Sequence, residues 1–233
     1  MSRICIIPAR GGSKRIPRKN IRDFMGKPII AHSIEAALES GIFDEVMVST
    51  EDAEIVEVAK AHGAAVPFLR SPENSTDMAM TAPVLIEVLD RYAELGRNFD
   101  TACCLYPTAP FVRASRLREA CRLLESSEDD AVVPVVRFSY PIQRSLRMTE
   151  GGRLEMFWPE NYNKRSQDLE PAYHDAGQFY LLRTTSLRIQ QVLFPSRTRP
   201  VVLVDEEVQD IDSPEDWKIA EWKCRWLREA SHP

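Results

Sequence analysis

The chain has 233 residues, of which 44% are hydrophobic and 28% are charged, and its 35 Asp and Glu against 30 Lys and Arg give a net charge of -5 at pH 7. These proportions are typical of a globular protein and exclude a disordered chain, while the longest apolar runs are far shorter than the roughly 18 residues that a membrane-spanning helix needs. A net acidic chain also argues against general nucleic-acid binding, which requires a basic face, so we expect neither a nucleic-acid partner nor a membrane partner.

The first predicted element is a buried strand over Arg3–Pro8. Because it begins almost at Met1, it leaves no room for a signal peptide, and we expect a cytoplasmic location. A loop with the sequence PARGGSKRIPRKN follows at residues 8–20. It contains no acidic residue, and its basic residues are Arg10, Lys14, Arg15, Arg18 and Lys19. Glycines let a backbone approach closely and cations neutralise charge, so the loop is suited to binding phosphates. It matches neither GxxxxGK[ST] nor GxGxxG, which argues against a Walker ATPase and a dinucleotide-binding protein.

Helices and strands then alternate as far as residue 136. Helical spacing of apolar residues occurs at 30–38, 55–62, 84–92 and 115–125, and short apolar runs typical of strands occur at 45–49, 64–68, 101–105 and 131–136. This alternation predicts a three-layer α/β fold with a mainly parallel sheet, in which ligands bind beyond the carboxyl ends of the strands. The loops at Arg70 and Tyr106 should therefore lie at the same rim as the basic loop.

The regular pattern breaks between residues 137 and 176, where prolines, Gly151-Gly152 and a mixture of polar and aromatic residues predict an inserted hairpin or arm. Strands resume at 178–182 and 200–204, and Ser213-Pro214 begins a last helix. We expect one domain over residues 1–233, with the segment 137–176 as its dimerisation element, and hence a homodimer.

Several of these blocks resemble the sugar-acid cytidylyltransferases, a family that includes the CMP-sialic acid synthetases. Ile7–Lys14 together with Lys19-Asn20 is similar to the family signature. The other matching blocks follow in the family order: Gly26-Lys27-Pro28, Phe68-Leu69-Arg70, Ser75-Thr76-Asp77, Pro107–Pro110 and Asp210-Ile211-Asp212. The resemblance covers nearly the whole chain. It implies a Rossmann-like nucleotidyltransferase fold and transfer of CMP from CTP to the anomeric hydroxyl of a nonulosonic acid, with release of pyrophosphate.

The resemblance also implies roles for residues of the rim loops. The expected nucleotide contacts are Ala9, Arg10, Gly11, Gly12, Lys19, Asn20, Arg70 and Ser75. Arg10 and Lys19 would act in catalysis by stabilising the charge on the departing pyrophosphate, together with Asp212. The sequence does not identify a general base.

The family places a metal at the acidic pair Asp210 and Asp212. Residues i and i+2 of an extended chain face the same side, so both carboxylates can reach one Mg²⁺, a cation that prefers oxygen ligands and bridges them to phosphates. The alternative is helix capping, because Asp212 also precedes Ser213-Pro214. The spacing alone leaves the two interpretations even, and the resemblance favours the metal.

Two blocks bear on the sugar. Tyr106 stands where the common sialic acid pattern has Gln, and the stretch 173–180 resembles the pseudaminic acid branch of the family. The expected sugar contacts are Tyr106, Thr108, His174, Asp175 and Gln178, although a lone His beside a strand is as often structural. The cation that faces the sugar carboxylate stays open among Arg137, Arg144, Lys164 and Arg165.

Pseudaminic acid is therefore the expected substrate. N-acetylneuraminic acid and legionaminic acid are the alternatives within the enzyme class. The rival from a different class is a catalytically silent nucleotide-binding regulator, which should lack Lys19 or the acidic pair, and both are present in this sequence.

Overall fold

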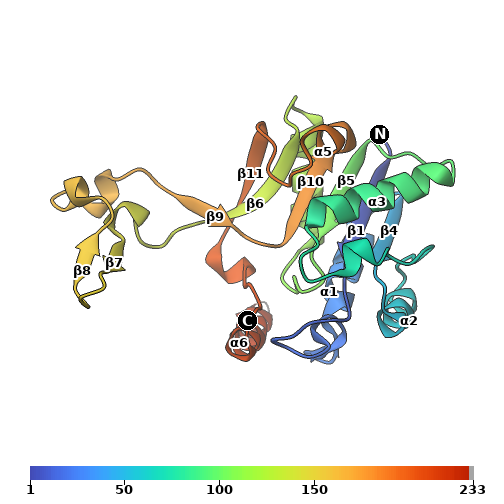
Figure 1. Cartoon of the computed structure of the whole chain (residues 1–233), viewed down its shortest axis with the longest axis horizontal. Coiled ribbons are helices and arrows are strands. Elements are labelled where there is room, and N and C mark those ends of the chain that lie inside the picture. The colour runs from blue at the N-terminus through green and yellow to red at the C-terminus, as the bar shows by residue number, and fades with distance from the viewer. Residues whose placement is uncertain (231–233) are drawn as a thin grey trace.

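The computed structural model describes residues 1–230 and contains a central seven-stranded sheet of order β11-β6-β10-β5-β1-β4, with β9 pairing with β6 (Figure 1). Five strands run parallel, and β9 and β10 run against them. The strands are β1 (Arg3–Pro8), β4 (Glu45–Ser49), β5 (Thr101–Leu105), β6 (Ala131–Arg137), β9 (Tyr173–Asp175), β10 (Phe179–Arg183) and β11 (Thr198–Leu203). The predicted, mainly parallel sheet is confirmed.

Helices cover both faces of the sheet because successive strand residues point to opposite sides. Cys103 packs with the helices on one face and its neighbour Cys104 with those on the other. The first face carries α1 (Ile29–Ser40), α2 (Ala53–Ala61) and α4 (Ala114–Glu125), and the second carries α3 (Thr81–Glu94) and α5 (Thr184–Gln190). None of the helices within residues 1–230 is long and apolar enough to span a membrane. The result is the expected three-layer arrangement.

The strand predicted at residues 64–68 is wrong. The structure contains only one parallel bridge there, between Met47 and Ala65. Ala65 exchanges its two backbone hydrogen bonds with β4, accepting from Val48 and donating to Val46. Two residues later Pro67 has no N–H to donate, so the ladder cannot continue. β4 is therefore an edge strand of the main sheet.

An arm of residues 138–172 projects from the end of the sheet (Figure 1). It contains a small hairpin of β7 (Leu146–Met148) and β8 (Leu154–Met156) and three short 3₁₀ turns. The arm returns through β9, so residues 173–175 of the predicted insertion belong to the main sheet. The arm exposes many large apolar side chains, namely those of Phe138, Tyr140, Leu146, Met148, Leu154, Phe157, Trp158 and Tyr162.

The last helix, α6 (Pro214–Ala230), packs against the basic loop. Trp217 is buried and shares a hydrophobic cluster with Ile16 of that loop and with Phe24. Ser213 and Asp216 form the cap: the Asp216 backbone N–H donates to Ser213 Oγ (3.2 Å), and Ser213 N–H donates back to the Asp216 carboxylate (2.8 Å). This packing places the residues just before α6 beside the basic loop.

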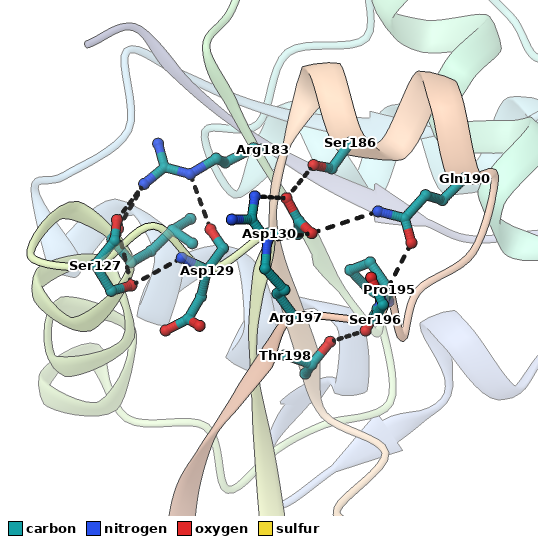
Figure 2. Close-up of polar contacts among 11 residues, drawn as sticks. Ser127, Asp129, Asp130, Arg183, Ser186, Gln190, Pro195, Ser196, Arg197 and Thr198 are labelled. Carbon is teal, nitrogen blue, oxygen red and sulfur yellow. Dashed lines mark hydrogen bonds and ion pairs between the residues drawn. The ribbon is translucent and has the colours of Figure 1, made fainter.

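At the end of the sheet away from the rim loops, a buried carboxylate, that of Asp130, joins neighbouring elements (Figure 2). Asp130 precedes β6 and is 5% exposed. It accepts hydrogen bonds from Ser186 Oγ (2.5 Å), Arg197 Nη2 (3.1 Å) and Gln190 Nε2 (3.4 Å). The Arg197 guanidinium, followed by the Ser186 hydroxyl, lowers the pKa of Asp130 to about 2. These bonds join β6, α5 and the start of β11 at the edge away from the rim loops.

We expect Asp130→Ala to lower the free energy of unfolding by about 2 kcal/mol, because three donors lose a charged acceptor. The difference from the wild type should be fully present above pH 3.8 and should shrink as the pH falls toward about 2, since the Asp130 pKa is depressed. Urea unfolding at pH 7, 5 and 3 measures it. The control is Asp90→Ala, which removes a surface ion pair with Arg188 and should cost under about 1 kcal/mol. Equal losses for both variants would contradict the prediction.

Candidate active site

A cleft of about 580 Å³ opens at the carboxyl ends of the parallel strands. Four segments that are distant in sequence supply its walls: the basic loop, the loop between Arg70 and Thr81, the turn that follows β5, and Asp212 just before α6. The lining residues that bear on the argument are Arg10, Lys14, Lys19, Asn20, Arg70, Asn74, Asp77, Thr81, Tyr106, Thr108 and Asp212. The structure thus brings some of the predicted site residues into one cleft, namely Arg10, Lys19, Asn20, Arg70, Tyr106, Thr108 and Asp212. The other predicted residues lie outside its lining, namely Ala9, Gly11, Gly12, Ser75, His174, Asp175, Gln178 and Asp210.

The basic loop is held in shape by its own polar groups. Arg18 has a left-handed backbone (φ 55°), and its guanidinium pairs with Asp52 (2.5 Å) and with Glu54. Asp52 is also the N-cap of α2 and accepts from the Glu54 and Ile55 amides. The Asn20 side chain donates to the Arg10 carbonyl at 2.9 Å. Arg18 is therefore committed to the scaffold, and Arg10 and Lys19 are presented to the cleft.

Gly11 is required by a close contact. Its N–H donates to the Glu51 carboxylate at 2.8 Å. A Cβ on Gly11 would lie well inside van der Waals contact with the Asp52 carboxylate, whose Cγ would be 2.9 Å away. A Cβ on Gly12 would meet nothing within 4 Å. The two glycines of the pair therefore differ: Gly11 is half-buried and packs against Asp52, whereas Gly12 is exposed, and neither glycine lines the cleft.

We expect Gly11→Ala to cost about 2 kcal/mol of stability by overpacking, because Asp52 cannot retreat without giving up Arg18 and the cap of α2. The shifted loop should raise the nucleotide KM about tenfold. The matched control is Gly12→Ala. It should change the free energy of unfolding, and the free energy of nucleotide binding that corresponds to the KM, by less than about 0.5 kcal/mol each. Thermal unfolding and nucleotide titration of the two variants test the prediction. Identical behaviour of the pair would refute it.

The cations of the cleft face carboxylates on two sides. Arg10 (2.5 Å) and Lys14 both pair with Asp77 from the second loop, and Arg15 pairs with Asp212 (2.9 Å). Lys19 Nζ donates to the Ile211 carbonyl at 2.7 Å and lies 3.7 Å from the Asp212 carboxylate. Burial lowers the pKa of Lys19, while the charges of Asp212 and Asp210 oppose that shift. The cleft therefore gathers several cations, and its own carboxylates, Asp77 and Asp212, pair with them.

Arg70 is the buried cation of the second loop. It is 8% exposed, and its guanidinium donates to the Ser49 hydroxyl at 3.1 Å and to the Ser49 carbonyl. Burial lowers the pKa of Arg70, and the charges of Glu51 and Glu87 partly restore it. Ser75, the other nucleotide contact predicted in this loop, lies outside the cleft lining, and its Oγ donates to the Ser71 carbonyl at 2.7 Å. Asn74 and Thr81, which the prediction missed, line the cleft instead.

The acidic pair is positioned by a buried anchor. Glu207 is 6% exposed and pairs with Arg113 (3.1 Å) and Arg116 (2.8 Å) of the α4 region. The Gln178 side chain donates to the Glu207 carbonyl at 2.6 Å, so this predicted sugar contact instead holds the segment that leads to Asp210. Because α6 is capped by Ser213, the Asp212 carboxylate is free of the capping role considered for it.

The acidic pair fits the expected Mg²⁺. Within residues 1–230, no group of three or more His, Cys, Asp or Glu side chains is assembled as a metal cage. Mg²⁺ characteristically takes one or two carboxylates and completes its shell with water and phosphate oxygens. Partial burial, followed by the charge of Asp212, raises the pKa of Asp210, so the two carboxylates act on one another. Two interacting carboxylates, of which Asp212 lines the cationic cleft, form a suitable set of donors.

The predicted sugar residues divide into two groups. Tyr106 and Thr108 line the cleft. Asp175 lies at the end of β9 and accepts the hydroxyl proton of Tyr180, whose ring packs edge-to-face on Tyr106 with centroids 5.5 Å apart. His174 is exposed, and its ring contacts Phe138 at the root of the arm (4.9 Å), outside the cleft lining. Tyr180 belongs to the same sequence block, 173–180, as Asp175, but only the folded structure shows that it contacts Asp175 and Tyr106.

Ala9 takes a scaffold position. It is fully buried, and its backbone N–H donates to the Ser49 carbonyl at 2.9 Å, so it fixes the start of the basic loop. The four candidates for the sugar carboxylate, Arg137, Arg144, Lys164 and Arg165, all lie outside the lining of this cleft. Arg165 pairs with Asp168 (2.8 Å) on the arm, and Arg137 lies at the arm's root.

Comparisons with known proteins show which proteins the chain is similar to. A family model described as Cytidylyltransferase matches residues 4–190. The chain is 43% identical to the pseudaminic acid cytidylyltransferase of Campylobacter jejuni, over 94% of this chain and 95% of that protein. It is 34% identical to the CMP-N,N'-diacetyllegionaminic acid synthase of Legionella pneumophila, over 94% of each. A solved CMP:2-keto-3-deoxy-manno-octonic acid synthetase complexed with CTP has a TM-score of 0.71 at 18% identity, covering 98% of this chain and 100% of that one, which confirms the predicted fold.

Proposed function

The chain belongs to the cytidylyltransferase family, and from that premise we propose that it transfers CMP from CTP to the anomeric hydroxyl of pseudaminic acid. The observation that supports this reaction is the cleft, whose lining contains the cations Arg10, Lys19 and Arg70 together with the carboxylate of Asp212. The observation that favours this sugar is the 43% identity to a pseudaminic acid cytidylyltransferase over nearly the full length of both chains.

The reaction is an in-line displacement at phosphorus. The anomeric oxygen of the sugar acid attacks the α-phosphorus of CTP, the bond from that phosphorus to the bridging oxygen breaks, and pyrophosphate leaves. The hydroxyl proton passes to solvent or to a base that we do not assign. The chain's contribution is to position the two substrates and to neutralise charge. Arg10 and Lys19 stabilise the negative charge that builds on the pyrophosphate.

We propose that Asp210 and Asp212 hold Mg²⁺. When bound, the ion would polarise the α-phosphoryl group and share the charge of the triphosphate. Lys19 supports the acid segment, with contacts to the Asp212 carboxylate and to the Ile211 carbonyl, and both Lys19 and Asp212 line the cleft.

A substrate panel tests the function. The purified chain is incubated with CTP, Mg²⁺ and, in turn, pseudaminic, N,N'-diacetyllegionaminic and N-acetylneuraminic acid, and pyrophosphate release is followed. We expect pseudaminic acid to give the highest kcat/KM. A higher value with another acid would assign the chain to that branch of the family. A silent regulator would bind CTP without releasing pyrophosphate with any of the acids.

We also propose a homodimer in which the arm reaches the partner subunit. One support is the set of exposed apolar side chains on the arm, because so many together are more than the scattered apolar residues of an ordinary protein surface. The other is that Arg144, Lys164 and Arg165 lie outside the lining of the cleft of their own chain. Light scattering during size-exclusion chromatography should give twice the chain mass. The double variant Met148→Asp/Leu154→Asp should give the monomer mass. A monomeric wild type would overturn this proposal.

A cytoplasmic location is part of the proposal. All five cysteines are unpaired, and four of them are buried, as expected for a chain that folds under reducing conditions. CTP is also a cytoplasmic nucleotide. Fractionation of cells that produce the chain, followed by immunodetection, tests this location, and recovery in a membrane or extracellular fraction would contradict it.

A further inference from the structure

Glu87 of α3 holds the second loop of the cleft from behind. Glu87 is half-buried and lies outside the cleft lining. Its carboxylate accepts three hydrogen bonds from the loop that follows Arg70. Ser71 N–H donates to Oε1 at 2.7 Å, Ser71 Oγ donates to Oε2 at 2.9 Å, and Asn74 Nδ2 also donates to Oε2. One helix residue therefore fixes both the backbone and a side chain of this wall.

Asn74 connects Glu87 to the cleft. The Asn74 N–H donates to Ser71 Oγ at 3.3 Å, at the start of the short 3₁₀ turn η2 (Glu73–Ser75). On one side Asn74 lines the cleft. On the other side it lines a smaller hollow of about 380 Å³ beside α3, which Glu87 also lines. A change at Glu87 can therefore reach the cleft through the Asn74 side chain.

The carboxylate determines which way the Asn74 amide faces. Burial would raise the pKa of Glu87, but the hydrogen bonds from Asn74 and Ser71 outweigh that effect and lower the pKa, so Glu87 is ionised at neutral pH. An ionised carboxylate only accepts hydrogen bonds, whereas an amide donates through its nitrogen and accepts through its oxygen. Nδ2 must therefore face Glu87. Oδ1 is the atom of Asn74 that remains to accept a hydrogen bond from a molecule in the cleft.

Asn74 lies in a loop whose two ends carry or contact the cations suited to a triphosphate. Arg70 begins the loop, and Asp77 near its far end pairs with Arg10 and Lys14 of the basic loop. All of these residues line the same cleft as Asn74. Ionised phosphate oxygens only accept hydrogen bonds, as does Oδ1. The Asn74 oxygen is therefore suited to the nucleoside that is joined to the phosphates and not to the phosphates themselves.

We propose that Asn74 is a specificity residue whose Oδ1 accepts a hydrogen bond from an N–H or O–H group of the nucleoside, and that Glu87 is the positioning residue that fixes this orientation. The inference rests on the proposed function and deepens it. The donors that cytidine offers are the 4-amino group of the base and the ribose hydroxyls. The cations recognise the charge of the nucleotide, and Asn74 recognises a donor on it.

Titration calorimetry with CTP, UTP, 2′-deoxy-CTP and 3′-deoxy-CTP tests the proposal, in the presence of Mg²⁺ and without a sugar acid. We expect Asn74→Ala to raise the Kd of CTP about tenfold, the value of one hydrogen bond. The Kd of the analogue that lacks the donor should rise by no more than about twofold, because that analogue never makes the bond. UTP identifies the 4-amino group, and the deoxy nucleotides identify a ribose hydroxyl.

Glu87→Gln supplies the second arm of the test. The Ser71 N–H is a fixed backbone donor, so the oxygen of the new amide must take the Oε1 position and its nitrogen the Oε2 position. That nitrogen would face Asn74 Nδ2, so the Asn74 amide turns over to avoid two opposed donors. The Kd of CTP should again rise about tenfold. The double variant Glu87→Gln/Asn74→Ala should lie within about twofold of Asn74→Ala, because Glu87 acts through Asn74.

The matched control is Glu73→Gln, which makes the same change of charge within the same loop. Glu73 is exposed and lies outside the cleft lining, so the Kd of CTP should equal that of the wild type. An unchanged Kd of CTP in Asn74→Ala, equal losses for all four nucleotides, or additive losses in the double variant would overturn this inference while the function stands. A wild type that binds no CTP would overturn the proposed function and this inference with it.

Discussion

Asp212→Asn is expected to lower kcat about a thousandfold at saturating CTP, sugar acid and Mg²⁺. The change removes one of the two charges that are proposed to hold the metal, and losses of two to three orders of magnitude are typical when an electrostatic contact to the reacting phosphate is removed. The fold should survive, because the cap of α6 belongs to Ser213 and Asp216. Pyrophosphate release measures the rate, and thermal unfolding should remain within about 2 °C of the wild type.

The control for Asp212 comes from the same segment. Asp205 has a side chain that is 73% exposed and lies outside the cleft lining, so Asp205→Asn should keep the wild-type rate. Below saturating Mg²⁺ the activity of Asp212→Asn should fall further than that of the wild type, whereas Asp205→Asn should keep the wild-type dependence on Mg²⁺ concentration. An Asp212→Asn enzyme with undiminished kcat would remove the basis for the metal assignment.

Lys19→Ala is expected to reduce kcat/KM for CTP by about two to three orders of magnitude. Lys19 lines the cleft and contacts the acid segment, with Nζ at 2.7 Å from the Ile211 carbonyl and 3.7 Å from the Asp212 carboxylate. Its removal deletes a charge opposite the leaving group and leaves the acid segment without one of its two cationic neighbours, the other being Arg15. The loss should fall mainly in kcat, because Arg10, Lys14 and Arg70 still bind the triphosphate.

The matched control is Lys27→Ala, since Lys27 also pairs with a carboxylate, Glu35, but outside the cleft. Its kinetics should equal those of the wild type. A Lys19→Ala enzyme that loses only CTP affinity, with kcat unchanged, would assign Lys19 to binding and not to the departure of pyrophosphate.

The sequence was most informative where a local rule governs the backbone. The helices predicted over 30–38, 55–62 and 84–92 all form, and within two residues of its end each is followed by a glycine with positive φ, namely Gly41, Gly63 or Gly96. The strand at residues 3–8 and the loop that follows it were predicted together, because a short apolar run and paired glycines are both local signals. The strand at 64–68 failed because Pro67 limits it to one bridge.

Contacts between distant segments were beyond the reach of the sequence. A buried Glu is uncommon, so nothing in the pattern indicated that Glu207 anchors the acid segment through Arg113 and Arg116. Gln178 was assigned to the sugar because it lies in a family block, but its side chain supports Glu207. The pairing of Tyr106 with Tyr180 depends on β10 running antiparallel beside β5, a topology that alternating helices and strands do not specify.

The packing of α6 on the basic loop has a consequence for synthesis of the protein. Ile16 and Phe24, near the start of the chain, meet Trp217, which lies near the end of the described residues. A ribosome delivers the basic loop early and the acids beside it late. The last strand of the main sheet, β11, ends at Leu203, only shortly before Asp210 and Asp212, so the acids join the basic loop only after every strand of the sheet has been synthesised.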